Sequence, residues 1–87
     1  MASYKITWKK SAFQELKKIQ NEYIPKIIDS VEKLSADPFP PGVKKLSGSD
    51  KTFRIRVGNY RIIYEIEKQI LTIQIIRVRH RKDAYKK

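Results

Sequence analysis

The fold is decided by the stretch Phe53-Arg54-Ile55-Arg56-Val57-Gly58-Asn59-Tyr60-Arg61-Ile62-Ile63-Tyr64. Its first half alternates apolar residues with arginines, which is the period-2 pattern of a strand with one buried face. Gly58-Asn59 then predicts a two-residue turn, with glycine at the first central position as a type II′ turn prefers. The stretch therefore predicts a β-hairpin at about residues 52–66.

The turn also sets the register of the hairpin, so that Arg56 faces Arg61 and Arg54 faces Ile63. Three guanidiniums are then expected on one face of the sheet, where like charges repel and cost free energy. A guanidinium stays charged at physiological pH and matches two phosphate oxygens with parallel hydrogen bonds. The arrangement favours a phosphate site. A charged sheet face that only keeps the protein soluble is the alternative.

Composition narrows the class of protein. A length of 87 residues predicts a single domain, residues 1–87, and the net charge of +11 is typical of nucleic-acid-binding proteins, ribosomal proteins, small toxins and basic membrane-surface peptides. Cysteine is absent and the single histidine has no carboxylate cluster, so we expect no metal and no other cofactor. No apolar run approaches the roughly 20 residues of a membrane span, and the N-terminus lacks a signal-peptide pattern. We therefore expect a cytoplasmic protein without a membrane partner.

The segment before the hairpin predicts a strand and two helices. Alternation from Tyr4 to Trp8 indicates a strand at about residues 3–8. Ser11 and Gln14 have the spacing of a capping box at the start of a helix. A second helix is expected to start within Asn21 to Pro25, with an apolar stripe and with Pro25 in its first turn. The two helices are predicted to form an antiparallel hairpin.

The segments around the arginine hairpin complete the predicted sheet. A proline-rich loop leads to a short strand at residues 43–46, and a last strand is expected at residues 70–78. Leu71, Ile73 and Ile75 are expected to point to the apolar side of the hairpin, so that this side covers the helices. The predicted fold class is α+β: an N-terminal strand, a two-helix antiparallel hairpin, then an antiparallel β-meander. The helices pack on one face of a curved, mostly antiparallel sheet.

The end of the last strand and the tail carry further residues suited to RNA chemistry. Strand pairing is expected to bring this segment past Arg61. A histidine can move a proton near neutral pH, and a tyrosine can stack on a base or orient a group through its hydroxyl. A surface histidine, a packing tyrosine and a solvated tail are the alternatives. The residues concerned are Arg77, Arg79, His80, Arg81 and Tyr85.

Three segments of the chain resemble the RelE branch of the RelE/ParE toxin superfamily. They are, in order, Lys45-Leu46-Ser47-Gly48, Phe53 to Tyr64, and Val78-Arg79-His80-Arg81-Lys82-Asp83-Ala84-Tyr85. The resemblance runs through nearly the whole chain and implies a RelE/ParE-like fold in a single RelE-like toxin domain. It also implies a toxin of a type II toxin–antitoxin pair that cleaves mRNA in the ribosomal A site without a metal.

In the reaction that the resemblance implies, the ribose 2′-hydroxyl attacks the adjacent phosphate and leaves a 2′,3′-cyclic phosphate and a free 5′-hydroxyl. By position, Arg54 and Arg56 fall where a relative has two lysines in its catalytic strand. Arg61 matches an arginine that holds the scissile phosphate, and Arg81 matches one near the leaving oxygen. Tyr85 matches a tyrosine that orients or stacks on the substrate, although its spacing from Arg81 is shorter here.

The arginines at positions 54 and 56 leave no lysine in that strand to take up the 2′ proton. Arginine is a poor general base, because its pKa lies above about 12. We therefore hypothesise that the arginines stabilise charge and that His80 transfers the proton, with Arg81 assisting. Substrate binding is expected from Lys45, Lys51, Arg77 and Arg79.

The implied partners are a small acidic RelB-like antitoxin and the 70S ribosome with mRNA in its A site. Two other functions stay open at this point. A ParE-like toxin has the same fold but inhibits DNA gyrase by binding, and its relatives generally lack the arginines and tail residues seen here. A non-catalytic RNA- or DNA-binding module is the other alternative.

Overall fold

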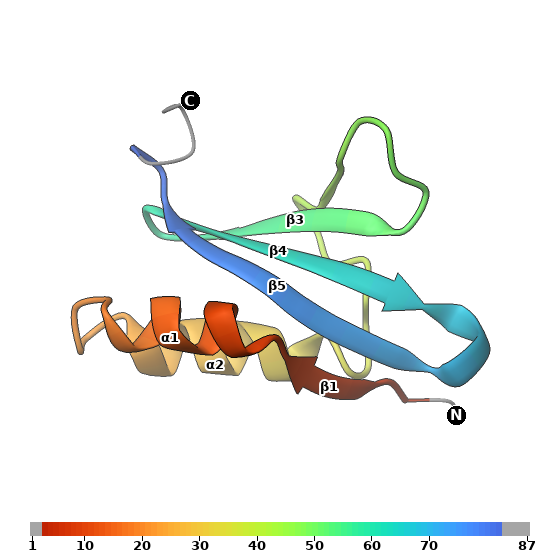
Figure 1. Ribbon diagram of the computed structural model, residues 1–87, viewed down its shortest axis with the longest axis horizontal. Helices are drawn as coiled ribbons and strands as arrows, with labels where there is room; N and C mark the ends of the chain where they lie inside the picture. The colour runs from red at the N-terminus through yellow and green to blue at the C-terminus, as the bar shows by residue number, and fades with distance from the viewer. Residues whose placement is uncertain (1–2, 83–87) are drawn as a thin grey trace.

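Five strands form one sheet in the order β1-β5-β4-β3-β2. The computed structural model describes residues 3–82 (Figure 1). The parallel pair is β1 with β5, and the other neighbouring strands are antiparallel, which confirms the predicted mostly antiparallel sheet. The strands are β1 Lys5–Trp8, β2 Lys44–Lys45, β3 Thr52–Val57, β4 Tyr60–Glu67 and β5 Thr72–His80.

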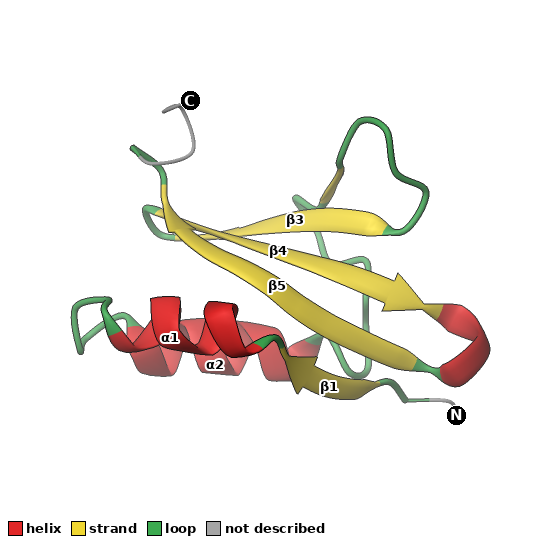
Figure 2. Cartoon of the chain, viewed as in Figure 1, coloured by secondary structure: helices red, strands yellow, loops and turns green. Residues whose placement is uncertain are grey.

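Two helices, α1 Lys10–Lys17 and α2 Ile24–Lys33, lie on one face of the sheet (Figure 2). Pro25 lies in the first turn of α2, as predicted. The predicted capping box at Ser11 is wrong, because the N-cap of α1 is Lys9, two residues earlier, and no side chain caps the helix. The Lys9 N–H donates to the Ile75 carbonyl at 2.9 Å, so the chain passes from β1 directly into the helix.

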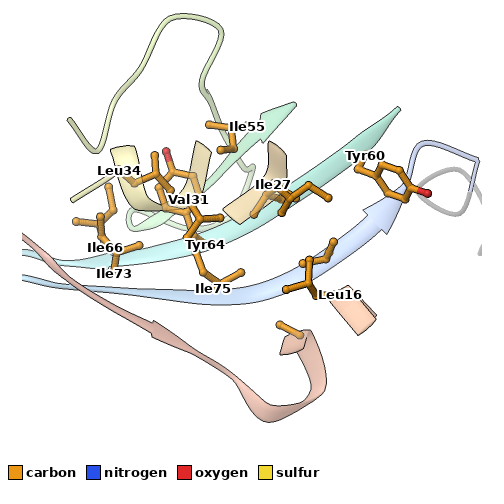
Figure 3. Packing of buried hydrophobic residues seen from close by; sticks show 13 residues of the cluster. Leu16, Ile27, Val31, Leu34, Ile55, Tyr60, Tyr64, Ile66, Ile73 and Ile75 are labelled. Carbon is orange, nitrogen blue, oxygen red and sulfur yellow. The ribbon is translucent and has the colours of Figure 1, made fainter. Parts of the chain in front are cut away.

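The core lies between the two helices and the apolar face of the sheet (Figure 3). Leu16 of α1 and Ile27 of α2 are almost fully buried, as expected for the inner faces of amphipathic helices. They pack against residues of β3, β4 and β5. The sheet residues of this core are Ile55, Tyr60, Ile62, Tyr64, Ile66, Ile73, Ile75 and Val78.

The arginine hairpin has the predicted register. Arg56 is opposite Arg61, and Arg54 is opposite Ile63. Gly58 has a φ of +58°, which suits the first central position of a type II′ turn. A Cβ at this glycine would also lie 3.2 Å from the Tyr23 ring, so the turn packs closely on the segment that enters α2.

The last strand begins later than predicted. A short 3₁₀ turn at Lys68–Ile70 and a left-handed residue, Leu71 with φ of 48°, separate β4 from β5. The prediction that Leu71 points into the core is therefore wrong, and 39% of its surface is exposed. Ile73 and Ile75 are fully buried, which confirms their predicted side of the sheet.

A β-bulge in β5 changes which side chains share a face. Tyr64 pairs with Ile75 while the adjacent Ile63 pairs with Arg77, so one residue of β5 is left over. Strict alternation from Ile75 would point Arg77 toward the helices. The bulge instead turns Arg77 outward and buries Val78 in the core.

The buried Tyr64 ties the proline-rich loop to the sheet. Its hydroxyl donates to the Pro38 carbonyl at 2.7 Å. We expect Tyr64→Phe to lower the free energy of unfolding by about 1–2 kcal/mol, because the carbonyl loses its donor. Urea denaturation measures this, and an unchanged midpoint would contradict it.

The same phenol gives the stability a pH dependence. Burial, and then the Asp37 carboxylate, raise the pKa of Tyr64 above its ordinary value. The folded state therefore holds the phenolic proton more tightly than the unfolded chain. The contribution of the protonated Tyr64 phenol to the free energy of unfolding is fully present below about pH 10 and is lost as the pH rises further. Above that pH the wild type should lose stability more steeply than Tyr64→Phe.

Candidate functional site

Three arginines from three neighbouring strands form a row across the sheet. Arg56 of β3 is opposite Arg61 of β4, and Arg61 is opposite Arg79 of β5. Directly opposite residues share a face, and their Cα atoms are about 4.5–5.5 Å apart in antiparallel pairs. These three residues are called the arginine row below. Arg61 is its middle member and is 9% exposed.

Two further arginines extend the row into a positive surface. Arg54 and Arg77 both lie opposite Ile63, on either side of it and on the same face as the row. We call the five residues the arginine face. Strand pairing places them on the side of the sheet opposite the core residues, and Arg77, at the free edge of β5, also reaches Glu15 of α1. The hairpin brings Arg54, Arg56 and Arg61 together as predicted, and the bulge adds Arg77 and Arg79.

Three residues of the arginine face have no carboxylate partner in the described part of the chain. Within residues 3–82, Arg54, Arg56 and Arg79 form no ion pair, and Arg77 lies 3.5 Å from a Glu15 oxygen. Like charges this close cost free energy unless an anion joins them. A phosphate would meet several guanidiniums at once, with charge-assisted and bidentate hydrogen bonds.

Glu15 of α1 is a site residue that the sequence did not reveal. Its Oε1 accepts the Val78 N–H at 2.9 Å, and its Oε2 faces Arg77 Nη1. The carboxylate therefore reaches both residues that follow the bulged position in β5. No local pattern singles out a glutamate in the middle of a helix, because its partners come from a strand 62 or more residues later.

The structure does not bring His80 onto the arginine face. His80 pairs with Tyr60, whose side chain belongs to the core, and the two rings meet edge to face with centroids 5.2 Å apart. Its Nδ1 accepts the Lys82 N–H at 3.1 Å. The imidazole thus lies at the helix side of the sheet, next to the end of β5.

The tail residues are placed only in part. The Arg81 N–H donates to the Asn59 carbonyl at 2.6 Å, which extends the β4–β5 ladder by one residue beside the hairpin turn. Strand alternation would direct the Arg81 side chain to the same face as Arg79. Tyr85 lies outside the described residues.

Lys45 and Lys51 lie at the other end of the sheet. Lys51 precedes Arg54 by three residues, or about 10 Å of strand. Each is paired with a carboxylate: Lys45 with Asp50 at 3.6 Å, and Lys51 with Glu67 at 2.5 Å. The hydrogen bond to Glu67 raises the pKa of Lys51. The structure does not bring these two lysines together with the arginine row.

The described part of the chain holds neither a cluster of metal-ligating side chains nor a membrane-spanning helix. Among residues 3–82, no three His, Asp or Glu side chains gather as metal ligands would. No helix in this part of the chain is long and apolar enough to cross a bilayer.

Comparison with known proteins identifies the family. The model for the ParE toxin of the type II toxin–antitoxin system parDE matches residues 6–85. The chain belongs to this toxin family. Among its relatives, toxin RelG of Mycobacterium tuberculosis is 30% identical over 88 residues, covering 97% of this chain and 98% of RelG.

Solved structures place the chain with the RelE-like members of the superfamily. The RelB–RelE complex of Methanococcus jannaschii matches with a TM-score of 0.75 and 30% identity, over 91% of this chain and 94% of that one. The RelE–RelB complex of Pyrococcus horikoshii shares the fold, with a TM-score of 0.81 and 24% identity over 91% and 96%. These matches confirm the predicted resemblance: the protein is a RelE-like type II toxin.

Proposed function

We propose that this RelE-like toxin is a metal-independent endoribonuclease that cleaves mRNA in the A site of the ribosome. The observation that supports this best is the arginine row, in which Arg56, Arg61 and Arg79 lie opposite one another on three strands. A rigid sheet keeps such donors in place without reorganisation, as stabilisation of a charged transition state requires.

In the proposed reaction the 2′-oxygen attacks the neighbouring phosphorus and the bond from phosphorus to the 5′-oxygen breaks. The 2′ proton passes to a base, and the departing 5′-oxygen takes up a proton. Arg61 would hold the phosphate from the centre of the row, with Arg56 and Arg79 on either side. Arg54, Arg77 and Arg81 would bind flanking phosphates or the leaving oxygen, and Tyr85 would stack on or orient the substrate.

His80 stays the proposed proton acceptor. Its ring lies on the helix side, so the RNA has to pass around the free edge of β5 for the 2′-hydroxyl to reach it. We expect His80→Gln to reduce cleavage by roughly 10²-fold, the contribution typical of general base catalysis. Cleavage on translating ribosomes measures this, and an unchanged rate would remove His80 from the mechanism.

The proposed activity is tested by the ends of the RNA product. Wild-type toxin should cut mRNA on translating ribosomes and leave a 2′,3′-cyclic phosphate and a free 5′-hydroxyl. A message with a single 2′-deoxyribose at the cleavage position should resist, because it lacks the attacking hydroxyl. Cleavage of the deoxy message would contradict the proposal, since a hydrolytic mechanism would then operate.

A ParE-like function is the second candidate, because the matching family model is that of a ParE toxin. Such a toxin would inhibit DNA gyrase by binding and would leave mRNA intact. If the wild-type protein does not cut mRNA but blocks DNA supercoiling by gyrase, the ParE-like function is correct. A protein that binds RNA without cutting and without affecting gyrase would be a binding module.

We also propose an acidic RelB-like antitoxin as partner. The matched M. jannaschii and P. horikoshii structures are RelB–RelE complexes, and the net charge of +11 favours fast capture by an acidic chain. Such an antitoxin would fold on binding and cover part of the basic surface. Co-expression with an acidic RelB-like antitoxin that binds this protein should restore growth.

A further inference from the structure

A cavity of about 440 Å³ opens beside the last residues of β5. β1 covers the outer edge of β5 only as far as Ile75, where it ends at Trp8 (Figure 1). Beyond that point, β5 faces α1 and the segment after it. The volume is in the range of small-ligand sites. The cavity shares Arg79 with the arginine row, so one side chain borders both.

The lining combines an apolar surface with polar groups at its margin. Ile19, Tyr60 and Val78 supply apolar and aromatic surface, which suits a flat ring. Glu15 and Lys18 come from the helix side, and His80 lies edge-on to Tyr60. Three of the seven lining residues are apolar or aromatic and four are charged or titratable, so the lining offers both a stacking surface and hydrogen-bonding groups.

Glu15 gives this cavity an acceptor. The residue is partly exposed, with 29% of its side chain accessible, although one oxygen accepts the Val78 N–H and the other faces Arg77. A carboxylate offers about four lone-pair sites, so acceptor capacity remains after these two contacts. A ligand N–H group that enters the cavity would therefore meet a negative acceptor that the fold holds in place.

We propose that this cavity is a nucleobase subsite for the nucleotide next to the phosphate on the arginine row. The inference rests on the proposed function, because it takes RNA as the ligand of the arginine face. Neighbouring strands are about 4.8 Å apart, so the free edge of β5 lies within one nucleotide of Arg61. In this subsite the C4 edge of a pyrimidine lies toward Glu15, where the amino group of cytosine donates to the carboxylate and the O4 of uracil opposes it with lone pairs.

CMP and UMP provide the test, because cytosine has an amino group at C4 and a bare N3, whereas uracil has a carbonyl at C4 and an N–H at N3. Each is titrated into ¹⁵N-labelled toxin, with ribose 5-phosphate as a ligand without a base. All three should shift the Arg61 amide signal, while only nucleotides should shift Val78. CMP should bind roughly tenfold more tightly than UMP, since one hydrogen bond to a charged acceptor is at stake.

The Glu15→Gln variant separates recognition from folding. A glutamine oxygen still accepts the Val78 N–H, but its amide group donates where the carboxylate accepted. We expect Glu15→Gln to lose the tenfold preference for CMP while the Arg61 shifts persist. Glu32→Gln makes the same change of charge at a position outside the cavity and should keep the preference.

The outcomes are distinguishable from those of the cleavage assay. If Val78 does not shift with either nucleotide, or if CMP and UMP bind equally to the wild type, the base subsite is overturned even when mRNA is cut. If Val78 shifts with the expected preference and Glu15→Gln removes it, the subsite stands even when no cleavage is found.

Discussion

Replacing Arg61 with alanine is expected to reduce cleavage of mRNA on translating ribosomes by about 10³-fold. Arg61 is the central member of the arginine row, with an arginine opposite it on each side. Because it is largely buried, its guanidinium is fixed by the fold before RNA arrives. Loss of a preorganised donor to a developing charge affects the transition state more than RNA binding.

The control for this variant is Lys33→Ala, which also removes one positive charge but from an exposed position on α2. It should cut mRNA at nearly the wild-type rate. RNA binding of Arg61→Ala should fall much less than its cleavage rate. If Arg61→Ala folds, binds RNA and cuts within a few-fold of wild type, the arginine row does not carry the chemistry.

Ile75→Ala should have the largest effect on stability. Ile75 is fully buried, opposite Tyr64 on one side and Trp8 on the other. Truncation to alanine removes buried methyl groups and leaves a cavity between the sheet and the helices. We expect the free energy of unfolding to fall by about 3–4 kcal/mol, a large part of the total for a domain of this size.

Urea denaturation of Ile75→Ala measures this loss, and Ile70→Ala is the matched control. Ile70 is 70% exposed in the 3₁₀ turn before β5, so the same truncation there should cost less than about 0.5 kcal/mol. Equal destabilisation by the two variants would contradict the burial of Ile75 in the core.

The sequence predicted the hairpin and its three arginines correctly because their placement depends only on residues that are close together in the chain. A glycine turn fixes the register, and alternation then fixes the face of Arg54, Arg56 and Arg61. The apolar stripe of α2 follows equally from local periodicity. Such features need no knowledge of the rest of the molecule.

The rest of the site depends on contacts between distant segments. Strict alternation could not place Arg79 opposite Arg61, because the bulge that does so is set by burial of Val78 and by the contact with Glu15. The same bulge places His80 opposite Tyr60, away from the arginine face. The late start of β5 reflects a left-handed residue, Leu71, at a position where alternation predicts strand.

The parallel pairing of β1 with β5 has a consequence for synthesis of the toxin. Lys5 pairs with Thr72, so β1 can pair with β5 only after nearly the whole chain has been synthesised. Contacts between residues so far apart in the chain slow folding, since a large loop must close first. The same late strand carries Arg79. A nascent chain interrupted before β5 therefore lacks both the partner of its first strand and the third member of the arginine row.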